Sequence, residues 1–152
     1  MLEELVLPMN SCMKRCALLW QIIYAGHRIE ERLEGALDDI GLSLAKLNAL
    51  RHLVEAGEPM PLGQLADKIA CVKSNVTQLV DRLENDGLVR RLPDPRDRRS
   101  VLASVTEAGL ARYHTGAAAL AEAEAELLSE FPVDQQQQVS DMLTAFGGAA
   151  RV

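Results

Sequence analysis

Hydrophobic residues recur at a helical spacing over the first part of the chain. Between about residues 10 and 39, apolar side chains return every three or four positions, and no proline interrupts the run. Gly41 then ends the helix, and Ser43 is a good N-cap for a second helix over residues 44–55. Gly57 follows this second helix. The pattern therefore predicts one long helix and one shorter helix.

The last third of the chain shows the same helical character. Residues 107–131 are dominated by Ala, Leu and Glu, and Thr106 is a suitable N-cap in front of them. Pro132 breaks this helix, and apolar residues within 139–146 predict a short final helix. Since helices dominate both ends, we expect a mostly α protein.

The middle of the chain changes in character. Two short amphipathic segments, residues 62–69 and 76–83, are joined by only a few residues, which is the dimension of a helix-turn-helix. Two runs of β-forming residues follow, 88–92 and 101–105, and a proline-containing loop separates them. Residues 57–61 contain two prolines and are expected to form a turn or a short extended segment. The order helix, turn, helix, strand, loop, strand predicts a winged helix-turn-helix with a small β-hairpin wing.

Length and composition limit the class of protein. The 152 residues suit one compact unit and exclude a large multi-domain enzyme. Hydrophobic residues make up 48% of the chain but aromatic residues only 3%, so the core must be built mainly from aliphatic side chains. No stretch approaches the roughly 18 apolar residues of a membrane span, and acids occupy the first residues where a secretory signal would carry bases. We therefore expect a cytoplasmic protein without a membrane partner.

Charge is distributed unevenly along the chain. The net charge of −6 argues against indiscriminate binding to nucleic acid. Residues 62–106 nevertheless hold eight bases and six acids, and residues 90–99 alone hold five arginines and two aspartates. A cationic loop within an acidic protein is typical of a localised contact with phosphates.

The second short helix carries polar side chains opposite its apolar stripe. Amide side chains can pair with adenine, hydroxyls with base edges or phosphates, and cations with phosphates. A polar outer face can also be merely solvated, but here it coincides with a helix pair and a basic hairpin, which favours DNA recognition. The polar residues are Lys73, Ser74, Asn75, Thr77, Gln78, Asp81 and Arg82.

Five segments of the chain carry a recognisable pattern. They are QLA at 64–66, KSNVTQLVDRLE at 73–84, GLVRR at 87–91, DPRDRRS at 94–100, and 102–109 ending in TEAG. The DPRDRRS and TEAG segments are the most specific when they follow a helix-turn-helix at this distance. With these segments the chain resembles the MarR-type regulators over about residues 43–110, and its helix layout is similar elsewhere.

The resemblance implies a homodimer whose first and last helices interlock, with each winged lobe on one half of a palindromic operator in double-stranded DNA. It divides the chain into residues 1–42 and 107–152 for dimerisation and residues 43–106 for DNA binding. Asp94 would orient an arginine at the wing tip. The DNA-binding set is then Ser74, Asn75, Thr77 and Gln78 in the groove, Arg82 on a phosphate, Lys73 as a further cation of the same helix, and Asp94, Arg96, Arg98 and Arg99 in the wing.

Two positions depart from the family pattern. Val72 stands where members commonly have Ser or Thr, so Ser74 or a backbone group would have to cap the recognition helix. Gln78 stands where members often have Arg, which favours the reading of adenine over guanine.

The resemblance also implies a cavity for small aromatic or phenolic effectors, between the dimerisation helices and the winged lobe. Its polar candidates are His27, Arg51, His52 and Tyr113. No pair of histidines has the spacing of a metal site, so neither a metal nor a cofactor is expected.

Cys12 and Cys16 lie four residues apart and share one face of the first helix. Some peroxide-sensing relatives carry a reactive cysteine near this helix, and the neighbouring Lys14 and Arg15 could lower a thiol pKa. A free cysteine is more often a small buried hydrophobe, and we expect Cys71 to serve packing as well.

Together these features predict a dimeric winged-helix transcriptional regulator without enzymatic activity, most often a repressor in this family, released from its operator by a small molecule. Three alternatives stay open at this point. They are a regulator of the same fold that senses peroxide through Cys12 or Cys16, a winged-helix module that binds proteins instead of DNA, and an enzyme with Cys12 as nucleophile, for which no base is evident.

Overall fold

The structure is a computed structural model that describes residues 9–69, 73–129 and 131–147. Helices account for most of these residues, as the sequence predicted, and a small antiparallel sheet and the connecting loops account for the rest. The helices are α1 (Met9–Asp38), α2 (Leu44–Ala56), α3 (Leu62–Lys68), α4 (Lys73–Asn85), α5 (Glu107–Leu128) and α6 (Val133–Gly147), and the strands are β1 (Met60–Pro61), β2 (Val89–Pro93) and β3 (Val101–Val105).

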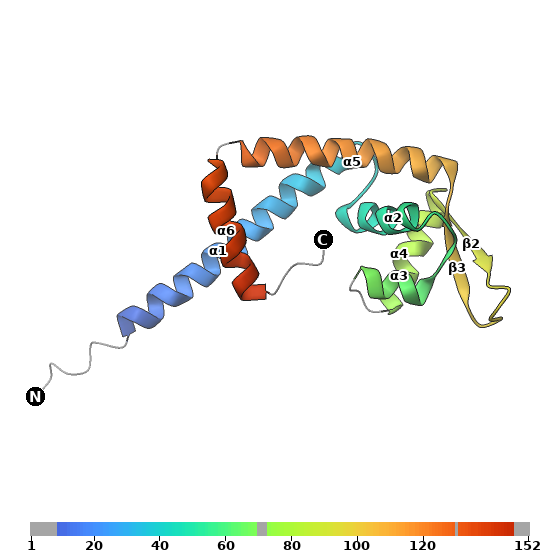
Figure 1. Cartoon of the computed structure of the whole chain (residues 1–152), viewed down its shortest axis with the longest axis horizontal. Coiled ribbons are helices and arrows are strands. Elements are labelled where there is room, and N and C mark those ends of the chain that lie inside the picture. Colours follow the sequence, from blue (N-terminus) through green and yellow to red (C-terminus); the bar gives the residue numbers. More distant parts are fainter. Residues whose placement is uncertain (1–8, 70–72, 130, 148–152) are drawn as a thin grey trace, which may run out of the picture.

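Helix α5 runs along one side of the molecule and connects its two ends (Figure 1). It packs against α1 over one part of its length and against α2 over another. Helices α3 and α4 lie beneath α2, and the sheet lies beside them at the end of the molecule opposite α6, where the β2–β3 hairpin projects. The fold is thus a compact winged lobe from which α1 and α6 extend away.

Local capping matches the sequence prediction at both predicted N-caps. The Ser43 hydroxyl oxygen accepts a hydrogen bond from the backbone N–H of Lys46 at 3.2 Å, and the Thr106 hydroxyl oxygen accepts one from Gly109 at 3.0 Å. At the other end of α2, Gly57 adopts φ of 66°, the left-handed conformation that glycine tolerates best. These bonds satisfy backbone groups that a helix end leaves without partners.

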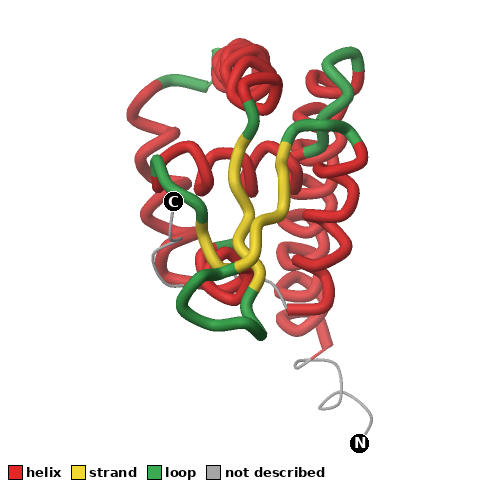
Figure 2. Tube along the Cα trace, turned by 90° about the vertical axis from the view of Figure 1, so that its right-hand side faces the viewer, coloured by secondary structure: helices red, strands yellow, loops and turns green. Residues whose placement is uncertain are grey.

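The sheet has one more strand than the predicted hairpin. Strand β1 pairs with β3 through Met60 opposite Ala103, so the order is β1-β3-β2 (Figure 2). Both Met60 and Ala103 are buried. The prediction of a turn or short extended segment at residues 57–61 left this pairing open, because a two-residue strand has no hydrophobic period of its own. Pro61 is tolerated there because β1 is an edge strand.

Aliphatic residues build the core, in agreement with the composition. Every core residue among those described is Leu, Val, Ala or Met, and the cluster joins α1, α2, α3, α4 and the sheet. Leu50, Val80 and Leu83 are completely buried at its centre. This core fixes the helix-turn-helix against the sheet and α2.

None of the described helices has the length and apolar character needed to cross a membrane.

Candidate nucleic-acid interface

Helix α4 presents three different faces. Its buried face consists of Val76, Val80 and Leu83. Asn75, Gln78 and Arg82 are exposed on the remaining surface of the helix, where they are open to a ligand as large as a duplex. A third face lies against β2 at Asp81 and Glu84. The side chain of Thr77 is exposed, and its backbone carbonyl oxygen also accepts a hydrogen bond from β2. The exposed part of α4 therefore matches much of the predicted recognition surface.

Two contacts hold α4 in this position. Gly87 adopts φ of 73° after the helix, and the backbone N–H of Leu88 donates to the Leu83 carbonyl at 2.9 Å. This turn allows β2 to begin directly beside the helix. On the other side, the Lys46 ammonium of α2 lies 2.7 Å from the Asp86 carboxylate just after α4. Recognition helix, wing and α2 are thus tied together over a short distance.

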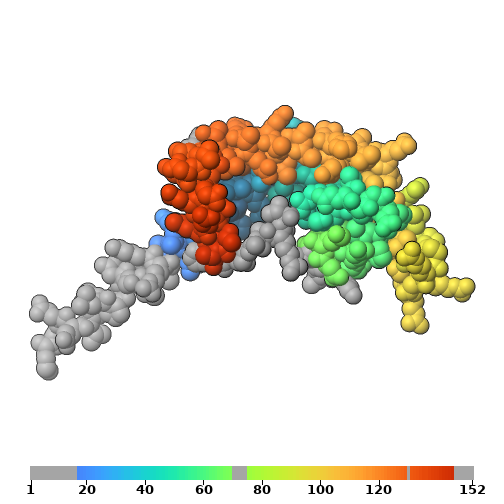
Figure 3. All heavy atoms as spheres, in the orientation of Figure 1, coloured from blue at the N-terminus to red at the C-terminus, as the bar shows by residue number. Residues whose placement is uncertain are grey.

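The tip of the hairpin carries the cations that the sequence predicted. The side chains of Arg96, Arg98 and Arg99 are exposed, and within the described part of the chain none of the three forms an ion pair. The wing projects beyond the rest of the lobe in the space-filling view (Figure 3). Its arginines are therefore accessible to a large anionic partner.

Asp94 makes a backbone contact that the sequence did not predict. Its carboxylate accepts the backbone N–H of Arg96 at 2.9 Å, and its expected role in orienting a tip arginine stays a prediction. Asp97 accepts the backbone N–H of Arg99 in the same way, also at 2.9 Å. Short acidic side chains favour such bonds to the backbone two residues on. The two aspartates therefore shape the loop, and the arginine side chains stay unrestrained.

Several predicted residues cannot be placed. The side chains of Lys73 and Ser74 lie outside the described residues, and so do Val72 and Cys71. The same holds for the side chains of Cys12 and Cys16, although the backbone of both belongs to α1. Within the described residues, no group of three or more His, Cys, Asp or Glu side chains is arranged to hold a metal ion.

The structure shows one residue at the contact between the wing and α4 that the sequence analysis did not single out. Arg91 lies in β2 and contacts the acids of α4, whereas its neighbour Arg90 is exposed. The alternation of side chains along a strand could have indicated that the two arginines face opposite sides. It could not indicate which of them meets the helix.

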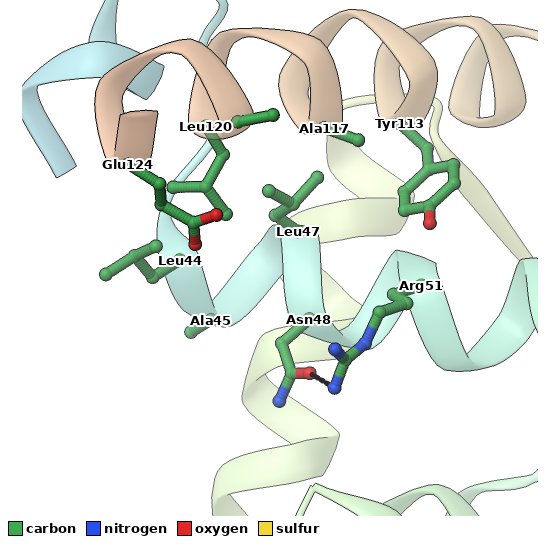
Figure 4. Close-up of a pocket in the computed structure, with 10 residues that line it drawn as sticks. Leu44, Ala45, Leu47, Asn48, Arg51, Tyr113, Ala117, Leu120 and Glu124 are labelled. Atoms are coloured by element: carbon green, nitrogen blue, oxygen red, sulfur yellow. Dashed lines mark hydrogen bonds between the residues drawn. The ribbon is translucent and has the colours of Figure 1, made fainter. Parts of the chain in front are cut away.

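A cavity of about 470 Å³ lies between α2 and α5 (Figure 4). Apolar side chains form most of its wall, with Arg51, Asn48 and Tyr113 at one end and Glu124 at the other. The Arg51 Nη2 atom donates to the Asn48 Oδ1 atom at 3.0 Å, while the buried Arg51 Nε has no hydrogen-bond acceptor. The lining residues are Leu44, Ala45, Leu47, Asn48, Arg51, Tyr113, Ala117, Leu120, Ala121 and Glu124.

Of the four predicted effector-site residues, the cavity brings together Arg51 and Tyr113 only. His27 lies on α1 in a separate acidic hollow, where its side chain is 71% exposed. His52 follows Arg51 directly, so it points about 100° away around the helix. It lies 3.5 Å from the Glu55 carboxylate, and burial together with the Arg51 charge lowers the pKa of His52 below its usual value.

A short helix pair whose second helix exposes a polar face beside a basic hairpin defines the winged helix-turn-helix class. The comparisons with known proteins agree. Residues 42–101 match the sequence model of the MarR family. The homoprotocatechuate degradative operon repressor of Escherichia coli is 30% identical over 87 residues, which cover 57% of this chain and 59% of that protein.

Two solved structures show how far the fold likeness extends. A MarR-family transcriptional regulator from Rhodococcus sp. RHA1 superposes with a TM-score of 0.74 at 25% identity, over 91% of this chain and 97% of that one. The organohalide-sensing regulator RdhR-CbdbA1625, solved with 2,4-dichlorophenol, superposes with a TM-score of 0.79 at 23% identity. The superposition covers 86% of this chain and 78% of that one. The chain is therefore similar to the MarR family over residues 42–101, and its fold is similar to that of a MarR-family transcriptional regulator over most of its length. Its matches span only 40% to 59% of the lengths of curated relatives such as the Bacillus subtilis regulator YkoM and the Escherichia coli repressor.

Proposed function

We propose that this protein is a sequence-specific DNA-binding regulator that acts as a homodimer on a palindromic operator. The observation that carries the proposal is the exposed face of α4, with Gln78 and Arg82, beside a projecting wing whose tip arginines, Arg96, Arg98 and Arg99, have no acidic partner among the described residues. The helix has the dimensions of the major groove, and the wing can reach phosphates or the adjacent minor groove.

The homodimer follows from the apolar surface outside the winged lobe. Large apolar side chains on α1, around the end of α5 and on α6 are between 48% and 79% exposed in the single chain, which is unusual for a soluble monomer. A second copy would cover these faces and place two winged lobes on one duplex. The exposed residues include Trp20, Ile23, Tyr24, Leu128, Phe131, Val133, Val139, Met142 and Leu143.

Recognition helix and wing should contribute differently to binding. Gln78→Ala should reduce the preference for the operator over random DNA by about 1–3 kcal/mol, because a bidentate pair with adenine is lost. Arg98→Ala should weaken binding to all duplexes and lower the slope of log K against log salt by about one unit. The DNA for these measurements is an operator fragment that the purified protein selects from random sequences. Fluorescence anisotropy at several salt concentrations gives both the preference for the operator and the salt slope.

Two outcomes would contradict this division of roles. If both variants change specific and non-specific binding equally, α4 does not read the sequence. If the parent protein selects no duplex and shows no salt-dependent binding, the proposal of DNA binding fails, and a protein-binding winged-helix module becomes the better interpretation.

The cavity between α2 and α5 supports regulation by a small molecule. Helix α2 lines the cavity and also contacts α4, through the common core and through Lys46 and Asp86. A ligand that changes the packing of α2 on α5 would therefore shift α4 relative to the winged lobe of the second copy in the proposed dimer. We propose that the protein is a repressor, as the name of its Escherichia coli relative says of that protein, and that the ligand releases it from DNA.

A filled cavity should abolish this response. Ala117→Leu places a larger side chain in the cavity wall and should weaken binding of a phenolic probe at least tenfold, while operator binding without the probe is retained. Ala118→Leu is the matched control, since Ala118 is the next residue of α5, is exposed and does not line the cavity. Calorimetry with 2,4-dichlorophenol and 4-hydroxybenzoate tests this, and equal affinities in both variants would exclude the cavity as the binding site.

A further inference from the structure

Strand β2 carries two consecutive arginines with different surroundings. Arg90 is exposed, and within the described residues it forms no ion pair. The side chain of Arg91 is only 28% exposed and is turned toward α4. Successive side chains of a strand point to opposite faces, so the two guanidinium groups lie on opposite sides of the wing at its base. Equal charge in the sequence thus hides two different environments.

Arg91 contacts α4 at three successive positions of one helical face. Its Nη1 atom forms an ion pair with the Asp81 carboxylate and lies 3.5 Å from Glu84 Oε2. Its Nη2 atom donates to the Thr77 carbonyl oxygen at 3.2 Å, and its backbone N–H donates to Glu84 Oε1 at 3.0 Å. Residues four and three apart lie above one another on a helix, so the guanidinium spans two turns of α4.

This contact joins the two elements that would meet DNA. The exposed face of α4 belongs to the same helix, and the wing tip lies beyond the end of the strand that carries Arg91. Arg96 follows Arg91 by five residues, of which Leu92 and Pro93 still belong to β2, so the tip lies at most roughly 16 Å from Arg91. A tilt of about 10° at the base would move the tip by up to about 3 Å, which is enough to break a directional hydrogen bond while the charges of the wing stay beside the duplex.

We propose that Arg91 is a positioning residue for DNA recognition: it fixes the angle between α4 and the wing and does not bind phosphate itself. The inference rests on the proposed DNA binding. Its planar fork is already engaged by two carboxylates and a carbonyl, so a phosphate contact would require those bonds to break. Asp81, although acidic and near the recognition face, then favours DNA binding because it anchors Arg91.

The sign of the Asp81 effect separates positioning from simple charge. Asp81→Asn removes a negative charge beside the recognition face, so electrostatics alone predicts tighter operator binding. Positioning predicts the reverse, and we expect a loss of threefold or more. Asp67→Asn is the matched control, because Asp67 is an exposed acid on α3 without an ion pair in the described part of the chain. This control should bind as tightly as the parent or tighter.

The salt dependence provides a second, independent readout. Arg91→Ala should weaken operator binding at least tenfold and reduce discrimination against random duplex, while the slope of log K against log salt stays at the parent value. Arg90→Ala removes the same charge from the adjacent residue, and any loss that it causes should appear as a lower slope. Arg91→Lys keeps the charge without the fork and should recover only part of the affinity.

All measurements use the full chain, the selected operator and fluorescence anisotropy, with thermal unfolding of each variant at the same concentration. If Arg91→Ala does not fold, Asp81→Asn still decides the question, because it is a nearly isosteric change at a partly exposed side chain. Tighter binding by Asp81→Asn, or a salt slope for Arg91→Ala lower by about one unit, would overturn the positioning role while leaving DNA binding by the parent intact. Absence of duplex binding by the parent would instead refute the proposed function.

Discussion

The Leu143→Glu variant should be monomeric at concentrations where the parent is a dimer, and its operator affinity should fall about 100-fold or more because two linked half-site contacts become one. Leu143 is 50% exposed on α6, one helical turn from Val139 and adjacent to Met142, so the three form an apolar stripe. In a dimer this stripe would be covered by the second copy. A buried, unpaired carboxylate there costs several kcal/mol.

Thr144→Glu is the matched control for this variant. Thr144 is the next residue of α6, is exposed, and lies away from the stripe, so the same charge would stay in water. Light scattering after size-exclusion chromatography gives the oligomeric state, and anisotropy with one-half-site and two-half-site duplexes gives the affinity. A Leu143→Glu protein that remains dimeric and binds both duplexes as the parent does would show that α6 is not part of the interface.

Gly109→Ala should destabilise the fold by about 3 kcal/mol, which corresponds to a melting temperature lower by about 10 °C for a chain of this size. A Cβ atom at residue 109 would lie 2.0 Å from the Leu88 carbonyl oxygen and 2.9 Å from Val105 Cγ2. The Leu88 oxygen already accepts the backbone N–H of Thr106 at 3.0 Å, so it cannot move away without a loss of that bond. The start of α5 would have to shift from the sheet.

Gly63→Ala provides the comparison. Gly63 lies in α3, and a Cβ atom there would have no neighbour within 4 Å. Alanine is favoured over glycine in a helix, so this variant should be as stable as the parent or more stable by up to about 1 kcal/mol. Thermal unfolding at one protein concentration compares the three proteins. Equal melting temperatures for Gly109→Ala and the parent would mean that α5 and the sheet can separate freely at this point.

The TEAG segment illustrates how far sequence reasoning extends. Thr106 was predicted as an N-cap from local chemistry alone, because the acceptor and the N–H that it caps lie three residues apart. The requirement for glycine at residue 109 has another origin, since the atom that excludes a side chain belongs to Leu88, at the start of the wing. A motif can therefore be recognised in the sequence although its physical cause lies in the packing.

The arginines of the wing show the same division. Composition and the two prolines predicted an exposed basic loop, and Arg96, Arg98 and Arg99 are exposed there. Arg91 carries the same charge, but it is engaged by Asp81 and Glu84. The Asp94 carboxylate also accepts the backbone N–H of Arg96, a contact that the charge pattern did not predict. Counting charges cannot show which of them are neutralised by a neighbour.

The sequence by itself predicted the long helices, their caps, the helix-turn-helix and the two main strands of the wing. Each depends on periods of two or 3.6 residues and on bonds that span three or four positions, so the information is local. The sequence did not predict the third strand or the contacts of Arg91 with α4. It also did not show that the cavity includes Arg51 but not His52. Each arises where segments distant in the chain meet, and the pairing of Met60 with Ala103 or of Arg91 with Asp81 exists only after the core has brought those segments together.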